Sequence, residues 1–423
     1  MDTVRNVSAI RRWVVVVVVV SLTGLTAACS GNSRSSSGKA PAPSTAGIPA
    51  GLSLSSFTST FSEMSKFKAL TAAGRGLVGV ILPDTTSSSR YVTFDVPYLT
   101  EAFQTAGYRL RQFKIDNAQG VDATELSDAR ADIARGATVL VFDPIDSTVA
   151  ARVESYAASR GVAVISYDRA TYRGTKTYDV GFDNVQVGKL IGQGFEQCVA
   201  AWGVAGPKVF ELDGTEHADP NAVSVAQGYN AVIWGTTTTP LTPPERNGDG
   251  YSLVGDKITS GSANGTGETI FQQQFSAHPE INATVEADDG LANDVITDLK
   301  NAGVAPKTIP TTGQGATLQG MENILQGFQC GSVYEAVYLE AQDAVALATI
   351  LRTGKAPPAG LVNTTITPPT GGAGRAEPAS LLTPVWVDAS NMESTVIKDQ
   401  FVSASTLCRA VGAGVCTAAG ITP

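Results

Sequence analysis

The stretch VAVISYDRATYRGTKTYDVGFDNVQVG, residues 162–188, decides the fold of this chain. It contains two apolar, β-branched runs, VAVIS at 162–166 and TYDVGF at 177–182. Runs of this length that stop abruptly at charged residues are typical of buried parallel strands. Side chains that follow the carboxyl ends of such strands lie where open α/β sheets bind ligands. The stretch therefore predicts both a parallel sheet and a binding edge.

Asp168 and Arg169 directly follow the first of these runs. A carboxylate accepts hydrogen bonds from hydroxyls and a guanidinium donates to them, so the pair could clamp a polyhydroxylated molecule. The structural alternative is a loop salt bridge beside a helix N-cap. Taken by themselves, these two residues leave both interpretations open.

Strand-like and helix-like segments alternate from Leu77 to about Leu351. The strand-like runs are 77–82, 108–115, 138–142, 162–166, 177–182, 207–212, 282–287 and 307–313. Amphipathic segments lie between them and are often closed by glycine, as helix ends are. This alternation predicts an α/β fold of parallel sheets with helices on both faces. The Gly/Thr/Pro-rich segment 235–250 and the Ala/Pro-rich segment 356–380 are interpreted as surface insertions.

Residues 1–28 have the features of a secretory signal peptide. Three arginines precede the apolar run 14–20, and small residues then lead to Cys29 in the sequence LTAAC, residues 25–29. A cysteine in this setting resembles a bacterial lipobox, although Thr26 stands where that motif usually has Leu. We therefore expect a lipoprotein anchored through Cys29 to the outer face of the cytoplasmic membrane. An uncleaved membrane anchor is the alternative.

Residues 29–56 are mostly Ser, Gly, Pro and Ala, with few large apolar side chains. Such a segment cannot bury enough surface to offset its ordering entropy, so it is predicted to be a flexible tether. The remaining body, from about Phe57 to Pro423, is long enough for two domains.

The charge and the rare residue types exclude several classes of function. The formal net charge is −9, and the few bases are not clustered, which argues against nucleic acid as a partner. His217 and His278 are the two histidines, and no Cys/His spacing suits a zinc site. We therefore expect neither a metal nor another cofactor.

Four cysteines remain if Cys29 carries lipid: Cys198, Cys330, Cys408 and Cys416. An even number in an exported protein suggests disulfide bonds. Four cysteines can pair in three ways. The short loop makes Cys408–Cys416 the first pairing to expect.

Motifs along most of the body resemble those of one family. In chain order they are Arg90-Tyr91, VLVFDPIDSTV (139–149), SYDR (166–169), VGFDNVQVGKLIG (180–192), ADPNA (218–222), EADDGLAND (286–294), TTGQGATLQGMENI (311–324), SVYEAVYLEAQDAV (332–345), LLTPVWVDASNMESTVIKD (381–399) and LCRAVGAGVCTAAGI (407–421). This order resembles the type I periplasmic binding proteins of sugar importers, most closely the D-xylose-binding group. The resemblance spans about residues 75–418.

The resemblance implies two Rossmann-like α/β lobes joined by a three-crossing hinge. The implied N-terminal lobe comprises residues 75–180 plus 313–335, and the C-terminal lobe 183–310 plus 338–355. A tail, 380–423, would pack on both lobes. The implied protein is a monomer that captures a monosaccharide, xylose or a similar aldose, in a cleft between the lobes. It would deliver that sugar to the permease subunits of an ABC importer.

The resemblance also implies which residues contact the sugar. Carried over position by position, they are Arg90, Tyr91, Asp168, Arg169, Asn221, Asp289 and Gln314. The arginines would donate to hydroxyls, the aspartates would accept from them, and the two amides can do both. Tyr91 would face the apolar side of the sugar ring, unless it is an ordinary core aromatic. Two positions depart from the family pattern: Glu335 stands where a basic residue is frequent, and Gly315 where an acid follows Gly-Gln.

Two functions of other kinds are open to the same sequence. An enzyme could use Asp168 and Asp289 as paired carboxylates, as glycosidases do. We expect no enzyme, since both aspartates have basic or polar neighbours suited to clamping a ligand. A sensory module of the same fold would instead present its sugar-bound form to a membrane signalling protein.

Overall fold

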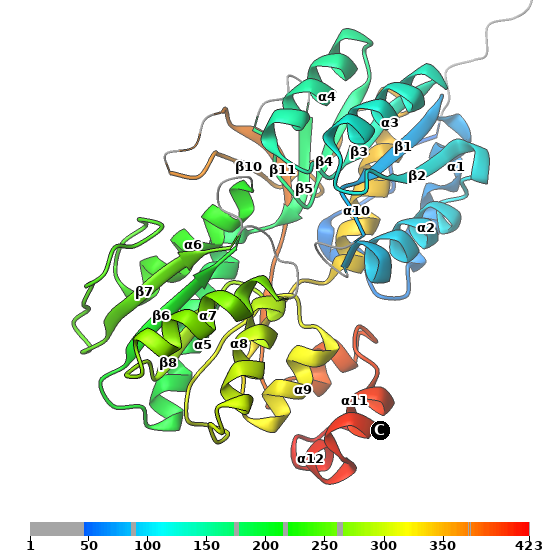
Figure 1. The fold of residues 1–423 in the computed structure, drawn as a ribbon. Coiled ribbons are helices and arrows are strands. Elements are labelled where there is room, and N and C mark those ends of the chain that lie inside the picture. The colour runs from blue at the N-terminus through cyan, green and yellow to red at the C-terminus, as the bar shows by residue number, and fades with distance from the viewer. Residues whose placement is uncertain are drawn as a thin grey trace, which may run out of the picture. The chain divides into compact units, whose positions relative to one another are not determined.

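The computed structural model describes residues 46–85, 90–172, 177–214, 219–259, 265–370, 372 and 374–422. These residues belong to one compact unit, Thr45–Pro423. Two parallel sheets with helices on both faces form two α/β lobes (Figure 1). The α/β fold class predicted from the alternation of strands and helices is confirmed.

The first lobe is built on a seven-stranded sheet of order β10-β11-β5-β4-β3-β1-β2. Its strands are β1 (Leu77–Leu82), β2 (Phe113–Asn117), β3 (Ala137–Phe142), β4 (Ala163–Tyr167), β5 (Thr177–Phe182), β10 (Thr364–Ile366) and β11 (Glu377–Leu382). Neighbouring strands pair in parallel, except that β10 is antiparallel to β11. The central strands are rich in Val, Ile and Leu because helices cover both of their faces.

Four helices cover this sheet: α2 (Val96–Thr105), α3 (Asp122–Ala134), α4 (Ser147–Ser159) and α10 (Val337–Leu351). Alternation along β1 separates the two faces. Ile81 packs in one hydrophobic cluster with Leu126 of α3 and Val149 of α4. Val80 packs in another cluster with residues of α2 and α10. Figure 1 shows α3 and α4 on one side of the sheet.

The second lobe has a three-stranded parallel sheet of order β7-β6-β8. Its elements are α5 (Asn184–Trp202), β6 (Lys208–Asp213), α6 (Pro220–Ile233), β7 (Ser252–Ile258), α7 (Thr266–Ala277), β8 (Ala283–Glu286), α8 (Asp289–Asn301) and α9 (Leu318–Gln326). Helices α5 and α6 share one apolar cluster with the sheet, and α7 and α8 share another on its opposite face.

Glycine lets α5 and α6 approach each other closely. A Cβ atom on Gly188 would lie 1.9 Å from the carbonyl oxygen of Val225 and 2.8 Å from the Cα of Gly228. No larger residue fits at this crossing without moving a backbone. The crossing positions the start of α6, which contributes to the candidate site described below.

A two-stranded antiparallel sheet of β9 (Ser332–Tyr334) and β12 (Val385–Val387) lies against α5. The described chain crosses between the lobes three times, at 182–184, 334–337 and 382–385. These crossings connect β5 to α5, β9 to α10, and β11 to β12.

Short elements complete the described chain. They are η1 (Leu54–Ser56), η2 (Ser62–Phe67), α1 (Lys68–Ala73), η3 (Tyr91–Asp95), η4 (Leu110–Gln112), η5 (Glu393–Ile397), α11 (Ala404–Val411) and α12 (Ala413–Ala418). Two disulfide bonds join Cys198 to Cys330 and Cys408 to Cys416. The pairing first expected, Cys408–Cys416, is confirmed.

Four sequence expectations about strands differ from the structure. The run 108–115 is a strand only from Phe113, since Leu110–Gln112 form the turn η4. Residues 307–313 form no strand, and Thr312 instead hydrogen-bonds to Glu286 beside β8. β7 was missed because it directly follows the Gly/Thr/Pro-rich segment 235–250. The Ala/Pro-rich segment 356–380 is only partly an insertion, since β11 begins within it and joins the sheet beside β5.

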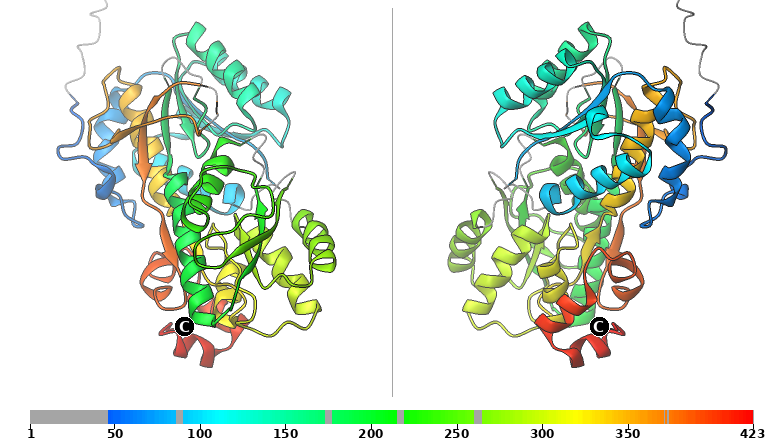
Figure 2. Two further views of the ribbon diagram at one scale, coloured as in Figure 1. Left: turned by 90° about the vertical axis from the view of Figure 1, so that its left-hand side faces the viewer. Right: turned by 90° about the vertical axis from the view of Figure 1, so that its right-hand side faces the viewer.

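The expected allocation of two segments to the lobes was also wrong. α10, within the expected C-terminal-lobe segment 338–355, packs on α2 and on strands of the first sheet. Figure 2 shows this helix beside the N-terminal helices of the first lobe. α9, within the expected N-terminal-lobe segment 313–335, packs on α8 of the second lobe. The apolar face of each helix fits either sheet, so its sequence does not select the lobe.

The predicted tether, 29–56, ends earlier than expected. Leu52 is buried in the core of the first lobe, and the Leu54 N–H donates to the Gly360 carbonyl at 3.1 Å. A few apolar side chains in this polar segment are enough to dock it. The signal peptide and Cys29 lie outside the described residues. Within the described ranges, no helix is both long and apolar enough to cross a membrane.

Candidate ligand-binding site

Arg90 stands at the centre of a cluster of charged side chains. It precedes the π-helical turn η3, and its guanidinium donates hydrogen bonds to three carboxylates. Nε contacts Asp95 Oδ2 at 3.1 Å, Nη1 contacts Asp168 Oδ1 at 2.9 Å, and Nη2 contacts both Asp95 and Glu340. The three acids come from η3, from the end of β4 and from α10, so Arg90 ties these elements together.

Burial and charge act against each other in this cluster. Burial disfavours the charge on Arg90, but Asp168, Asp95 and Glu340 outweigh it and raise the pKa of Arg90 well above its usual value. Burial also raises the pKa values of Asp95 and Glu340, while Arg90 opposes that rise. Arg90 therefore stays charged, and it offsets only part of the rise in the pKa values of Asp95 and Glu340.

Asp168 adopts a left-handed backbone conformation, with φ of 64°. A non-glycine residue in this region is strained, and such strain is frequent at functional sites. The Asp168 N–H donates to the Val180 carbonyl at 3.0 Å, and the Asp168 carbonyl accepts from Asn221 Nδ2 at 2.8 Å. Because Asn221 lies in the first turn of α6, this bond joins the first lobe to the second.

Arg169 makes a second contact between the lobes. Its Nε donates to Asp219 Oδ2 at 3.0 Å, and Asp219 also caps α6 through the backbone N–H of Asn221. On its other side, Arg169 Nη1 lies 3.8 Å from Asp143 Oδ1. The guanidinium carbon is 5.7 Å from the ring centroid of Tyr91, which is buried. Arg169 thus lies between an aromatic ring and two acids.

Gln314 and Glu335 meet near the second crossing. Gln314 Nε2 donates to Glu335 Oε2, and the backbone around Gln314 pairs with Val333 of β9. Glu335 is buried, and this burial raises its pKa to about 7, against the opposing effect of Arg90. Glu335, which stands where a basic residue is frequent in the family, therefore places a carboxyl group near Arg90.

Asp289 is placed differently from the other candidates. Its Oδ2 accepts from the backbone N–H and hydroxyl of Thr317, at 2.7 and 3.0 Å, and its Oδ1 accepts from Gln329 Nε2 at 2.8 Å. These partners all belong to the second lobe. The carboxylate of Asp289 thus fastens the start of α9 to α8, and in this conformation it is engaged away from Arg90.

We call the residues gathered at the lobe junction the interlobe cluster. Its members are Arg90, Tyr91, Asp95, Asp143, Asp168, Arg169, Asp219, Asn221, Gln314, Glu335 and Glu340. It brings together six of the seven predicted contact residues, all except Asp289.

Sequence reasoning missed four acids of this cluster: Asp95, Asp143, Asp219 and Glu340. Two of them carried a usable signal. Asp143 ends the apolar run of β3 just as Asp168 ends β4, and Asp219 precedes a proline at the start of a helix, an N-cap pattern. Asp95 and Glu340 lie inside helical segments, where their sequence does not distinguish them from solvent-exposed acids.

A group of buried acids in the second lobe was found only from the structure. Glu211, Asp213 and Asp256 bring carboxylate oxygens within 4.8 Å of one another. Oxygen ligands of this kind suit a hard cation such as Ca²⁺. Protein donors already contact them, since the Trp234 indole N–H donates to Glu211 at 2.6 Å and the Leu241 N–H to Asp256 at 2.6 Å.

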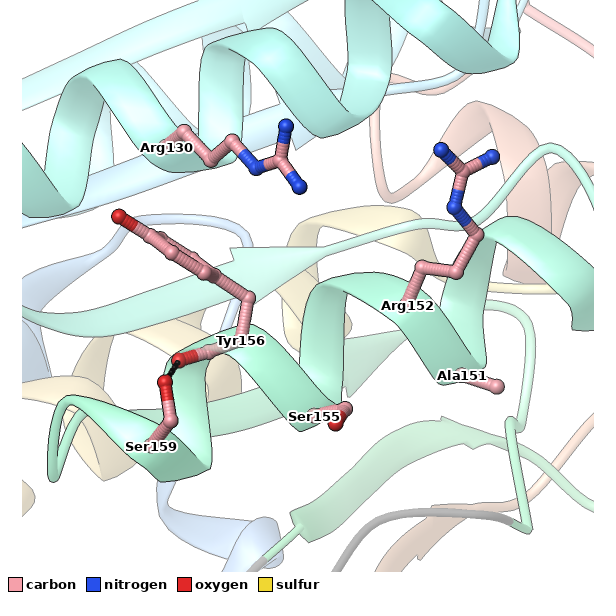
Figure 3. Close-up of a pocket in the computed structure, with 6 residues that line it drawn as sticks. All are labelled: Arg130, Ala151, Arg152, Ser155, Tyr156 and Ser159. Atoms are coloured by element: carbon pink, nitrogen blue, oxygen red, sulfur yellow. Dashed lines mark hydrogen bonds between the residues drawn. The ribbon is translucent and has the colours of Figure 1, made fainter.

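A surface pocket of about 490 Å³ lies between α3 and α4 on the first lobe (Figure 3). It is lined by Arg130, Ala151, Arg152, Ser155, Tyr156 and Ser159. The Arg130 guanidinium is 5.3 Å from the ring centroid of Tyr156. None of the interlobe cluster lines this pocket, so it is a separate feature of the first lobe.

Comparison with known proteins agrees with this architecture. The family model described as periplasmic binding protein domain matches residues 78–356. The multiple sugar-binding periplasmic protein SbpA of Azospirillum brasilense is 30% identical over 81% of this chain and 96% of its own. The D-xylose-binding periplasmic protein of Escherichia coli is 29% identical over 69% of this chain and 82% of its own.

Among solved structures, a carbohydrate transporter solute-binding protein from Chloroflexus aurantiacus in complex with D-glucose has the same fold. The TM-score is 0.66 at 24% identity, covering 78% of this chain and 98% of the other. The chain therefore belongs to the periplasmic binding protein family. It is a binding protein of the type I fold and not an enzyme.

Proposed function

We propose that this protein captures a monosaccharide, xylose or a similar aldose, between its two lobes outside the cytoplasm and delivers it to an ABC importer. One observation carries the proposal: charged and amide side chains from both lobes converge in the interlobe cluster. Arginines there can donate to sugar hydroxyls, while carboxylates and amides can accept from them. The names of the relatives support a sugar as the ligand.

The bonds between the lobes support capture by closure. Arg169 to Asp219 and Asn221 to Asp168 join the first lobe to the start of α6. A sugar that contacts both lobes would add bonds of the same kind and favour the closed form, as hinge-bending receptors do. Each sugar hydroxyl or partner left unpaired costs about 1–3 kcal/mol, which is enough to select among aldoses.

The proposal is tested by screening the folded body against pentoses and hexoses. A ligand that binds only the native state must raise the unfolding midpoint, so a sugar present at 100 times its dissociation constant adds about 2.7 kcal/mol of stability. Titration calorimetry then ranks the sugars that raise the midpoint. Failure of every aldose to bind would contradict the proposal.

We expect Arg169→Ala to lower sugar affinity about 10- to 200-fold, because hydrogen bonds to charged groups contribute about 1.5–3 kcal/mol. Arg169→Lys should not restore affinity, since an ammonium cannot present the planar donors of a guanidinium. Calorimetric titration measures both variants.

Arg152→Ala is the matched control, because Arg152 is exposed on α4 and lies outside the interlobe cluster. The opposing interpretation treats Arg169 as a structural ion pair with Asp219. It predicts that Arg169→Ala has a lower melting temperature and a normal sugar affinity. That combination would exclude a direct role of Arg169 in sugar binding.

We further propose that the protein is a lipoprotein held to the membrane through Cys29. The LTAAC sequence and the polar residues that follow it support this proposal. We expect Cys29→Ser to move the folded protein from the membrane fraction to the medium while sugar binding is unchanged. Ser33→Ala, in the polar segment that follows, is a control that leaves Cys29 in place. Unchanged membrane retention of Cys29→Ser would favour an uncleaved anchor.

A further inference from the structure

The interlobe cluster contains many more acids than bases. Its acidic members are Asp95, Asp143, Asp168, Asp219, Glu335 and Glu340, and its basic members are Arg90 and Arg169. The cluster holds six carboxyl groups against two guanidinium groups. A neutral sugar would leave this excess unchanged.

The two arginines are already shared among five of the acids. Arg90 forms ion pairs with Asp95, Asp168 and Glu340. Arg169 pairs with Asp219 at 3.0 Å and lies 3.8 Å from Asp143. Both guanidinium groups are therefore already engaged by carboxyl groups of the cluster.

Glu335 is the acid of the cluster that forms no ion pair among the described residues, although Arg90 lies near enough to lower its pKa. Among the described residues, no Lys, Arg or His nitrogen lies within 4 Å of its carboxyl oxygens, and its side chain accepts only from the neutral amide of Gln314. It is only 6% exposed. A buried carboxylate that no cation contacts directly is costly unless a ligand brings the charge or a proton does.

Other atoms of the cluster also lack donors. Neither carboxyl oxygen of Asp143 accepts a hydrogen bond within the described ranges, and Oε1 of Glu340 accepts none there. Both side chains are fully buried. Buried polar atoms of native proteins are nearly always satisfied, so these acceptors are open to the donors of a ligand bound in the cluster.

We infer that the sugar bound here carries a protonated amine, as a 2-amino-2-deoxy aldose does, and that the ammonium group pairs with Glu335. This inference rests on the proposed function, because it specifies the ligand of the same site. An ammonium supplies three donors and the positive charge that the cluster lacks. The hydroxyls of the same sugar would supply donors to the remaining acceptors.

The test compares sugars that differ only at the amine. Calorimetric titration of the full folded chain uses D-glucosamine against D-glucose and D-galactosamine against D-galactose, with the N-acetyl derivatives as uncharged controls. We expect at least one amino sugar to bind 10-fold or more tightly than both its hydroxyl and its N-acetyl counterparts. The charge-assisted hydrogen bond is large enough for this difference.

The variant Glu335→Gln assigns the effect to one residue. It keeps the size of the side chain and removes its charge. The affinities of the variant for an amino sugar and for its hydroxyl counterpart should therefore differ by less than about 3-fold. Glu101→Gln, at an exposed position on α2, should keep the preference. A circular dichroism melt of both variants verifies that they fold.

The outcomes separate this inference from the proposed function. Binding of neutral aldoses as tightly as their amino counterparts would overturn the inference and leave the sugar-binding function intact. An amino-sugar preference that survives Glu335→Gln would overturn the role of Glu335. Absence of binding by every neutral and amino sugar would overturn the proposed function itself.

Discussion

Arg90→Met is expected to destabilise the protein by about 3–5 kcal/mol and to reduce sugar binding below detection. Removing one partner of a buried ion pair leaves the other charge uncompensated, and this cost is of that size. Asp95 and Glu340 are both fully buried, and among the described residues each forms its ion pair with Arg90. Methionine fills a similar volume, so the loss would not come from a cavity.

The loss of folding stability in Arg90→Met should increase with pH. Burial already raises the pKa values of Asp95 and Glu340, and the loss of Arg90 removes an effect that lowers them. A carboxyl group whose folded pKa is raised destabilises the fold as pH rises above its unfolded pKa. The difference from the parent should therefore be largest at pH 8 and smaller at pH 5.

Urea denaturation of parent and variant at both pH values measures this dependence. Arg111→Met, at an exposed position, serves as the matched control and should change stability by less than about 0.5 kcal/mol. A deficit in Arg90→Met that is equal at pH 5 and pH 8 would contradict the electrostatic explanation.

Loss of the disulfide bond between Cys198 and Cys330 should cost more stability than loss of the one between Cys408 and Cys416. The first closes a loop with a sequence separation of 132, and the second one of 8. In the chain-entropy model, loops of these lengths correspond to about 5 and about 2.5 kcal/mol. The first bond also joins α5 to the segment before β9, which are distant in the sequence.

The experiment replaces each pair of cysteines by serine in turn and follows urea denaturation. We expect the Cys198→Ser/Cys330→Ser variant to lose about 2.5 kcal/mol more than the Cys408→Ser/Cys416→Ser variant. The second variant is the control, since it also removes a disulfide bond and two sulfur atoms. Equal losses of stability in the two variants would contradict the idea that loop length sets the contribution of each disulfide bond.

Periodicity in the sequence was sufficient for most of the first sheet. The runs that became β1, β3, β4 and β5 are short, apolar and bounded by polar residues, so pattern and length agree. It failed for 307–313. This segment forms no strand, and it is held beside β8 by the Thr312 side chain and by a hydrogen bond from the Thr284 N–H to the Pro310 carbonyl. Local composition carries no information about such a tertiary contact.

The candidate site was likewise predicted only in part, because some of its contacts depend on tertiary structure. Asp168 and Arg169 were evident because they end a strand, and the structure gathers them with Arg90, Asn221 and Gln314. The ion pair of Arg169 with Asp219 could not be predicted from the sequence, because it depends on how α6 starts in the other lobe. The placement of Asp289 against Thr317 and Gln329 likewise depends on a helix crossing.

The last strand to join the first sheet comes from far along the chain. β11, residues Glu377–Leu382, pairs with β5, although the whole second lobe lies between them in the sequence. A ribosome must therefore synthesise nearly the entire polypeptide before β11 can pair with β5. Non-local pairing of this kind delays folding. The first lobe therefore cannot complete its sheet until the second lobe has been synthesised.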